Sequence, residues 1–358
     1  MQLLKVISLT LLGVSFASAQ NSSAPLGDNS KTLTQLLTTP NNNFGVDKFV
    51  ALLTSDPGYA PIIQLLNSTD NNFTAFIPND RAITRLSSMY KSYARKQNMT
   101  AHGDYPPANF SISNITAADI VTYHVANGSY QLSNFTWNAN AIPSLLNNPE
   151  LDPLGNGLPL LVTSNVTAER IANSSWFNYN RQYLKYQVGN GLKGANVRVK
   201  DVGASNGWAN VIDSVLMPPG KPSTVLSNDS DTKILFNLVK QHPDLVNTLN
   251  NGSNFTLLAP NNNALRGVDF KSLSNDTIKS IILTHVIPGI YYSSNISLAA
   301  AQNNGNISVS TLNNYTLPIS VNGSRILIND TARVVDPNVL FNNGVMHVIN
   351  KLLMPPPA

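Results

Sequence analysis

Two stretches of the chain carry apolar residues at helical spacing, and each is interrupted at a proline. The first covers residues 47–66 and is broken near Pro57, and the second covers residues 232–249 and is broken at Pro243. Apolar residues three and four positions apart share one face of a helix. Each stretch therefore predicts two short amphipathic helices that pack against a core.

Shorter apolar runs predict strands. Residues 73–78 and 255–260 both begin with Phe-Thr and end at a proline, and residues 319–328 alternate apolar and polar positions around Asn322-Gly323. Such an Asn-Gly pair favours a tight hairpin turn. Two further apolar runs, each followed by a Pro-Pro pair, are predicted closing strands: residues 211–216 and 348–353. Helices and strands together indicate the α+β class.

Three blocks of sequence occur twice and in the same order. The matching pairs are residues 73–83 and 255–265, residues 123–130 and 284–291, and residues 206–219 and 343–356. Such a repeat predicts a tandem pair of one domain, covering residues 31–219 and 221–356. The prolines of residues 217–222 remove backbone donors, so neither a helix nor a sheet continues across this boundary.

The first copy is longer than the second. It has about 21 extra residues between the first and second matched blocks, and about 24 between the second and third. We expect these two insertions near residues 88–110 and 138–185. Insertions into a folded domain are usually surface loops, and that is the prediction for both.

The ordered motifs resemble the fasciclin domain, also called FAS1. They are Phe-Thr-x-(Phe/Leu)-x-Pro-Asn, then (Tyr/Thr)-His-Val-x-x-Gly-x-Tyr, then Asn-Gly-x-x-(Asn/His)-Val-Ile. The resemblance covers residues 31–356 in two copies. It implies two tandem FAS1 domains, each a β-sandwich wedge flanked by helices. It also implies a non-enzymatic role in cell adhesion or in association with a cell surface, cell wall or matrix.

The same resemblance implies an integrin-contact region around the Tyr-His pair. Only Tyr123-His124 matches that pair fully, because the second copy has Thr284 before His285. Tyr123, His124 and His285 are therefore candidate interaction residues. The alternative is that both histidines are buried and hydrogen-bonded, and hold a strand to a loop. The chain contains no Arg-Gly-Asp triplet.

A run of basic residues without an intervening acid follows the first Phe-Thr block. Helical spacing would place several of them on one side, where they could contact an anionic polysaccharide or a lipid headgroup. The alternative is a solvated helix face, which is the usual meaning of a charge run. Arg81, Arg85 and Arg95 are the candidate interaction residues of this run, which also contains Lys91 and Lys96.

The chain begins with a pattern typical of a secretion signal, so residues 1–19 are predicted to be a signal peptide. No later apolar segment is long enough to cross a membrane, and the C-terminal residues do not resemble a GPI-anchor signal. We expect a secreted protein, in the extracellular space or the cell wall. A vacuolar destination stays open, because secretory signals feed that compartment too.

The chain has 19 Asn-x-Ser/Thr triplets, whereas random placement would give about eight. This excess predicts N-glycosylation, and the resemblance is greatest to a fungal member of the family. The candidate glycosylation sites are Asn67, Asn72, Asn98, Asn134, Asn165, Asn254, Asn295 and Asn322.

Several kinds of chemistry find no support. The chain has no cysteine, which excludes thiol chemistry, and its net charge of +4 with only 12% charged residues is a weak argument for nucleic acid. Residues 203–207 match Gly-x-Ser-x-Gly, but a predicted strand follows where a nucleophile elbow needs a helix. Only two glutamates are present, Glu150 and Glu169, and His285 with His347 lacks a third metal ligand.

We therefore expect no enzyme activity, cofactor or metal. The expected partners are cell-surface or wall components, either protein or polysaccharide, and not nucleic acid. The alternative function is an extracellular or vacuolar binding protein for a small apolar or glycan ligand.

Overall fold

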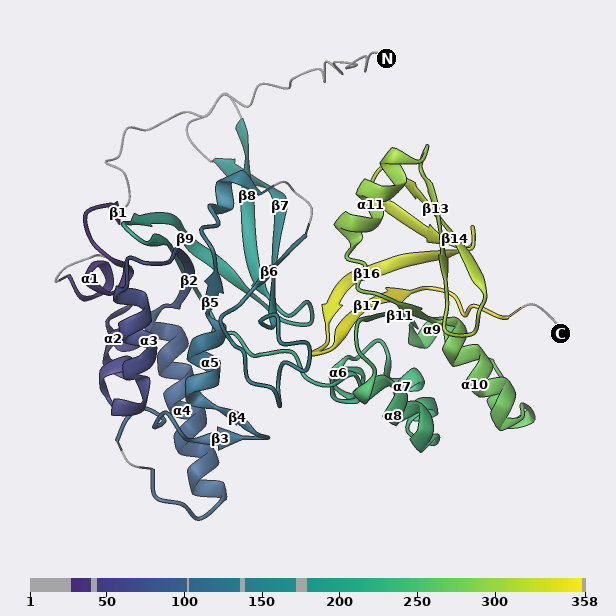
Figure 1. Cartoon of the computed structure of the whole chain (residues 1–358), viewed down its shortest axis with the longest axis horizontal. Coiled ribbons are helices and arrows are strands. Elements are labelled where there is room, and N and C mark those ends of the chain that lie inside the picture. The colour runs from purple at the N-terminus through teal and green to yellow at the C-terminus, as the bar shows by residue number, and fades with distance from the viewer. Residues whose placement is uncertain (1–26, 40–43, 102, 136–138, 172–178, 356–358) are drawn as a thin grey trace.

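The structure is a computed structural model, and it shows two domains of mixed helices and strands in tandem (Figure 1). The residues that it describes are 27–39, 44–101, 103–135, 139–171 and 179–355. The predicted signal peptide, residues 1–19, lies outside them.

The first domain contains a long mixed sheet and helices before and between its strands. Its helices are α1 (Leu33–Thr38), α2 (Asp47–Thr54), η1 (Pro57–Tyr59), α3 (Ala60–Asn67), α4 (Asp80–Lys96), α5 (Ala117–Tyr123) and η2 (Leu132–Asn134). Its strands are β1 (Gly27–Asp28), β2 (Phe73–Pro78), β3 (Ser111–Ile112), β4 (Ile115–Thr116), β5 (Val125–Asn127), β6 (Asn140–Pro143), β7 (Pro159–Ile171), β8 (Tyr179–Gly189), β9 (Gly194–Ala204) and β10 (Gly207–Ile212).

The second domain repeats this plan with shorter connections. Its helices are α6 (Pro222–Asn228), α7 (Lys233–Val239), α8 (Pro243–Asn251), α9 (Asn262–Leu265), η3 (Phe270–Ser272), α10 (Asn275–Thr284) and α11 (Ser293–Gln302). Its strands are β11 (Phe255–Pro260), β12 (Val286–Pro288), β13 (Asn306–Ser310), β14 (Thr316–Asn322), β15 (Arg325–Ile328), β16 (Ala332–Leu340) and β17 (Gly344–Ile349).

The two sheets have the same strand order. It is β5-β2-β10-β9-β8-β7-β6 in the first domain and β12-β11-β17-β16-β15-β14-β13 in the second. Each has a parallel pair between central strands, β2 with β10 and β11 with β17, in which Phe73 lies opposite Gly207 and Phe255 opposite Gly344. The first sheet has a further parallel pair, because β1 lies beside β9 outside this order. The repeat in the sequence is therefore a repeat of topology and of register.

Each domain has two apolar cores, one on each face of its central strands. Along β2, the side chains of Ala75 and Ile77 pack with the helices, whereas Phe76 packs with residues of β7 and β8. Alternate residues of a strand point to opposite faces, so a strand covered on both faces is apolar throughout. β11 repeats this division, with Leu257 facing one core and Leu258 the other. This arrangement is the β-sandwich wedge flanked by helices that the sequence resemblance implies.

The helical stretches and the first strands are where the sequence predicts them. Residues 47–66 form α2, η1 and α3, residues 232–249 fall on α7 and α8, and both interrupting prolines begin a new helical segment. Residues 73–78 and 255–260 are β2 and β11. The hairpin around Asn322-Gly323 is confirmed by the pairing of Asn322 with Arg325.

The predicted closing strands are displaced along the chain. The strands are β10 and β17, which start at the glycine of the Asn-Gly pair and end at Ile212 and Ile349. They end there because β2 and β11, their parallel partners, end at a proline. The later apolar residues Leu216 and Leu353 are buried, but their backbone N–H groups bond to histidine side chains instead of to a strand.

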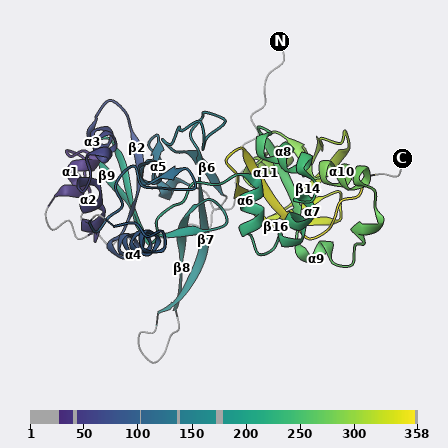
Figure 2. The same ribbon diagram turned by 90° about the horizontal axis from the view of Figure 1, so that it is seen from below.

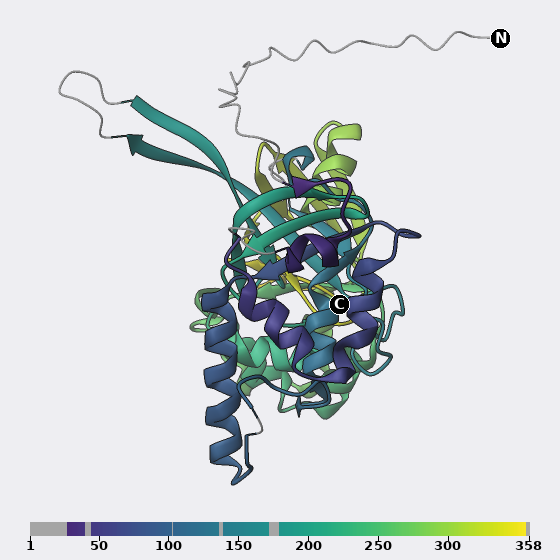
Figure 3. The same ribbon diagram turned by 90° about the vertical axis from the view of Figure 1, so that its left-hand side faces the viewer.

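The two insertions are not simple surface loops. The first lengthens a helix, because α4 has 17 residues and its counterpart α9 has 4, and it adds the small hairpin of β3 and β4. The second lengthens a hairpin, because β7 and β8 have 13 and 11 residues and their counterparts β14 and β15 have 7 and 4. This teal hairpin extends away from the body of the domain in Figure 3.

The two domains lie side by side (Figure 2), and residues of one contact the other directly. The turn between β8 and β9 reaches the second domain, where the backbone N–H of Leu340 donates to the carbonyl of Asn190 at 2.8 Å and Leu192 packs against the core. Leu161 packs with Leu340 and Val345 in a buried cluster of its own. The junction thus combines a backbone hydrogen bond with apolar packing.

Candidate functional site

His124 and His285 make the same contacts in the two domains. Each Nδ1 lies 2.7–2.8 Å from the carbonyl of the residue four positions earlier, in the preceding helix. Each Nε2 accepts a hydrogen bond from a backbone N–H beyond the last strand, from Leu216 at 2.9 Å and from Leu353 at 3.0 Å. Both rings are 1% exposed, and burial lowers the pKa of each to about 4. Each histidine is therefore neutral at pH 7 and links a helix to the segment that follows the last strand by hydrogen bonds.

Tyr123 is also interior, with no exposed surface, and its hydroxyl donates to the carbonyl of Pro159 at 2.7 Å. The expectation that Tyr123, His124 and His285 contact a partner is therefore wrong for the folded domain. The alternative interpretation is right that both histidines are buried and hydrogen-bonded. They join a helix to the segment after the last strand, however, and not a strand to a loop. A surface contact must use other residues.

His347 and Asn210 occupy equivalent positions and accept equivalent hydrogen bonds. Asn210 Oδ1 accepts from the backbone N–H of Asp201 at 2.9 Å, and His347 Nδ1 accepts from that of Asn338 at 3.2 Å. Both donors have positive φ, 56° and 66°, at irregularities in β9 and β16. His347 Nε2 also lies 2.7 Å from the carbonyl of Tyr291, so this histidine too is structural. Among the described residues no cluster of His, Asp and Glu could hold a metal ion.

The Gly-x-Ser-x-Gly match is a β-turn between two antiparallel strands. Gly203 lies in β9, which ends at Ala204, and Gly207 begins β10, so Ser205 lies in the turn of a hairpin. A nucleophile elbow needs a strand followed by a helix, because that turn places the hydroxyl beside backbone donors. The structure therefore offers Ser205 no such setting.

The basic run lies on α4, as predicted, and two of its members already have partners. Arg85 Nη2 donates to the backbone carbonyl of Asp213, and Lys91 forms an ion pair with Asp104 at 2.6 Å. Arg81, Arg95 and Lys96 are exposed and make no ion pair within the described part of the chain. These three cations are the ones free to meet an anionic partner.

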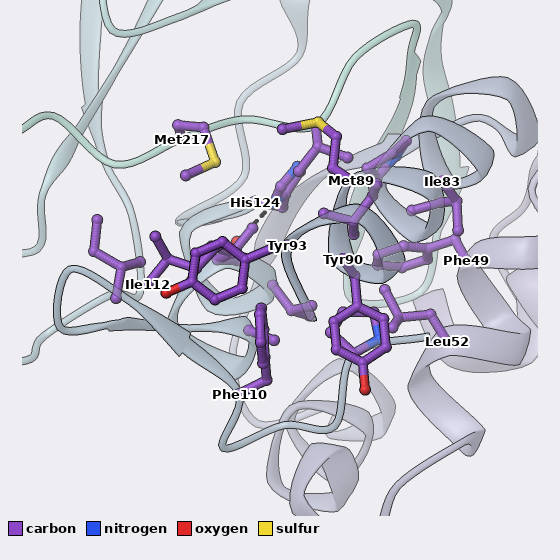
Figure 4. Close-up of a pocket in the computed structure, with 18 of the residues that line it drawn as sticks. Phe49, Leu52, Ile83, Met89, Tyr90, Tyr93, Phe110, Ile112, His124 and Met217 are labelled. Carbon is purple, nitrogen blue, oxygen red and sulfur yellow. Dashed lines mark hydrogen bonds between the residues drawn. The ribbon is translucent and has the colours of Figure 1, made fainter. Parts of the chain in front are cut away.

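The first domain contains an apolar pocket of about 530 Å³. Ligand pockets commonly have volumes of about 300–1,000 Å³ and mostly apolar walls. Its floor includes Leu52 and Ile83, and its walls include Tyr90, Tyr93 and Phe110. Figure 4 shows these side chains around the cavity, with Met89 and Met217 on one side of the view and Phe110 on the other.

The first insertion supplies one side of this pocket. Phe110 presents its ring edge-on to Tyr90 and Tyr93, with centroids 4.8 and 5.7 Å apart, which fastens the segment after α4 onto that helix. The β3–β4 hairpin adds Ile112 and Ser113 to the lining. The second domain has only the four-residue α9 at the place of α4, so it lacks this wall.

Sequence reasoning did not find this pocket. The available signal was the insertion itself, which places Met89, Tyr90, Tyr93 and Phe110 in a stretch that the second copy lacks. An insertion that is a plain surface loop has little reason to carry so many large apolar side chains. Their packing into a cavity wall depends on contacts that local periodicity does not reveal.

The family model described as the fasciclin domain matches residues 45–218 and 230–355. The chain belongs to the fasciclin domain family. The match covers both copies of the repeat. The two copies also share one strand order in the structure.

Among curated relatives, this fasciclin chain is similar to the transforming growth factor-beta-induced protein ig-h3 of Oryctolagus cuniculus, at 24% identity over 62% of this chain and 33% of the relative. It is 29% identical to periostin of Homo sapiens over 43% of this chain and 18% of the relative. It is 31% identical to a fasciclin-like arabinogalactan protein of Arthroderma benhamiae over 43% of this chain and 35% of the relative. The chain thus spans about a third or less of the length of these relatives.

Among solved structures, a FAS1 domain pair from the insect cell adhesion molecule fasciclin I is 18% identical. The likeness covers 87% of this chain and 98% of that chain, with a TM-score of 0.37. In the described part of this chain, no helix has the length and apolar character needed to cross a bilayer.

Proposed function

We propose that this chain is a secreted, N-glycosylated fasciclin-domain protein that acts without catalysis, in adhesion or in association with a cell surface, cell wall or matrix. The observation that carries the proposal is the pairing of two domains of this family across a packed junction. Two binding surfaces in a fixed arrangement hold a common target more tightly than one surface does.

The exposed sequons support the secretory part of the proposal. The asparagines of all eight candidate glycosylation sites are exposed. Asn72 and Asn254 immediately precede β2 and β11, so glycans on them would occupy equivalent places on the two domains. Such glycans would limit which faces a partner can reach.

The exposed cations on α4 support an acidic partner. Arg81, Arg95 and Lys96 lie on one helix of the first domain without acidic neighbours in ion-pair distance among the described residues. A wall or matrix polysaccharide with acidic groups, or an acidic protein surface, would complement them. The name of the fungal relative, an arabinogalactan protein, is consistent with a wall setting.

The test is localisation of the tagged full-length protein in its own cells, with sequential extraction by salt, detergent and glucanase. Retention until polysaccharide is digested supports wall association. The double variant Arg81→Glu/Arg95→Glu should be released at lower salt. Its control is Lys233→Glu/Lys271→Glu, which makes the same charge change at exposed sites of the second domain. Recovery of the wild-type protein only from the medium or the vacuole would exclude wall adhesion.

The apolar pocket favours a second candidate function, the binding of a small apolar ligand. Its volume and lining are those of a ligand site, and the second domain has the four-residue α9 in place of the helix that forms its wall. Native mass spectrometry of the protein purified from its own cells would test this. A mass shift that organic extraction removes would support a bound ligand, and an unshifted mass after exposure to apolar compounds would contradict one.

A further inference from the structure

Three of the apolar side chains that line the pocket are exposed and lie around its opening (Figure 4). Met89, Met217 and Ile112 are 69%, 48% and 44% exposed, and all three line the cavity. Single exposed apolar residues are normal on a protein surface, but a cluster at a cavity entrance marks a binding surface. Methionine side chains also adapt to differently shaped ligands, because they are unbranched and polarizable.

The pocket has few polar groups, and some of them already have hydrogen-bond partners within the protein. Lys96, in the last turn of α4, is the only Lys, Arg, Asp or Glu that lines the pocket, and Ser92 lies one turn before it. Lys96 makes no ion pair in the part of the chain that the structure describes. Tyr59 donates its hydroxyl to the carbonyl of Pro106, and both ring nitrogens of His124 are engaged. The buried polar groups of Tyr59 and His124 therefore have hydrogen-bond partners and carry no charge, and the charge of the lining is at the C-terminal end of α4.

We propose that the pocket binds a single-chain amphiphile with an acidic head group, its tail between α4 and the floor of the pocket and its head group at Lys96. This inference rests on the second candidate function. The apolar walls would cover the tail, and burial of apolar surface supplies most of the binding free energy. The ammonium of Lys96 would contact a carboxylate or a phosphate, which gives orientation and selectivity against neutral amphiphiles.

The head group is tested with three ligands of equal chain length: laurate, lauryl phosphate and lauryl alcohol. Their affinities for the full-length protein are measured by displacement of a fluorescent fatty acid. Both acids should bind at least several-fold more tightly than the alcohol, and the ratio between laurate and lauryl phosphate shows whether the natural head group is a carboxylate or a phosphate.

Lys96→Met tests the assigned cation, because it keeps the length and apolar stem of the side chain. It should weaken binding of both acids about tenfold and leave the alcohol unchanged. The matched control is Arg95→Met, which removes one charge from the neighbouring exposed position outside the lining. Arg95→Met should leave all three affinities unchanged.

Ser92→Trp tests the location, because it places an indole at an exposed position of the pocket lining. It should abolish binding of all three ligands. Ser88→Trp, at an exposed position one turn earlier on α4 and outside the lining, should not. Circular dichroism spectra of both variants should match that of the wild type.

The outcomes distinguish failure of this inference from failure of the apolar-ligand function on which it rests. Equal binding of acids and alcohol, or equal losses in Lys96→Met and Arg95→Met, would overturn the acidic head group and leave an apolar ligand site. Absence of binding by all three ligands would overturn the inference together with the apolar-ligand function. Neither result would change the wall-extraction result on which adhesion is tested.

Discussion

Asn206 Oδ1 accepts a hydrogen bond from the backbone N–H of Leu33 at 2.8 Å, although 173 positions separate the two residues. Its Nδ2 donates to the carbonyls of Leu66 and Ser68 at 2.9 and 2.7 Å. One buried amide thus joins the start of α1 and the end of α3 to the turn before β10. The side chain satisfies backbone groups that helix ends leave without partners.

Asn343 repeats only the donor half of this arrangement. Its Nδ2 donates to the carbonyls of Leu249 and Gly252, but its Oδ1 has no partner among the described residues. The reason is in the sequence, because Pro222 is the first residue of α6 as Leu33 is of α1, and proline has no N–H. Asn343 therefore uses only its amide nitrogen, whereas Asn206 uses both its nitrogen and its oxygen.

Asn206→Ala should reduce the stability of the first domain by about 3 kcal/mol, because the N–H of Leu33 and two carbonyls lose their partner. Asn343→Ala should reduce the stability of the second domain by about 2 kcal/mol, because only carbonyls lose their partner there. Calorimetry of the full chain measures both. Tryptophan fluorescence assigns the transitions, because all three tryptophans precede residue 219. Equal costs in the two domains would contradict this account of Pro222.

Acid should destabilise the second domain more than the first. The pKa of His124, His285 and His347 falls to about 4 through burial, whereas an unfolded histidine has a pKa near 6.5. Because the unfolded chain binds more protons in this window, stability is complete above about pH 6.5 and is lost as the pH falls toward about 4, by about 3 kcal/mol per histidine. The second domain holds two of the three. Burial also raises the pKa of Asp336, which offsets part of the loss near pH 4.

Urea unfolding at pH 7 and pH 5 measures this difference. His347→Asn is the matched variant, because Asn210 performs the same acceptor role in the first domain. It should reduce the pH dependence of the second domain to about that of the first, at a cost of about 1–2 kcal/mol at neutral pH for the lost contact with Tyr291. An unchanged pH dependence would show that His347 is not responsible.

Gly191→Ala should separate the domains without unfolding either. A Cβ at this position would lie 2.4 Å from the carbonyl oxygen of Asn338 and 2.6 Å from the Cα of Val339, both in the second domain. Gly267→Ala is the control, since its φ of +81° is close to the +89° of Gly191 but a Cβ there meets nothing within 4 Å. Small-angle scattering should show a longer particle for Gly191→Ala alone. An unchanged particle length would mean that the β8–β9 turn shifts to accommodate the methyl group while the two domains stay in contact.

Phe110→Ala should loosen the pocket wall. It removes two edge-on ring contacts with Tyr90 and Tyr93, at a cost of about 1–3 kcal/mol. Limited proteolysis should show faster cleavage between residues 97 and 110. Phe135→Ala removes a ring that packs against Tyr130 instead and should not change that cleavage. Equal cleavage rates in both variants would show that Phe110 does not fasten this segment.

The local elements could be predicted because their signals are local. Phe73 to Pro78 is apolar throughout and ends at a proline, and Asn322-Gly323 favours a tight turn in almost any setting. The ends of β10 and β17 could not be predicted in this way. Their apolar runs continue to Leu216 and Leu353, and only the length of the partner strands and the hydrogen bonds to the two buried histidines decide where pairing stops.

By itself the sequence determined the duplication, the fasciclin family and the early helices and first strand of each copy, because these follow from short motifs and periodicity along the chain. The tertiary structure alone decided that Tyr123, His124 and His285 are interior, that the first insertion is a helix wall around a pocket, and that the β8–β9 turn contacts the second domain. Each of these depends on residues far apart in sequence. Burial is a property of what packs around a side chain, and neighbouring residues in the chain do not specify it.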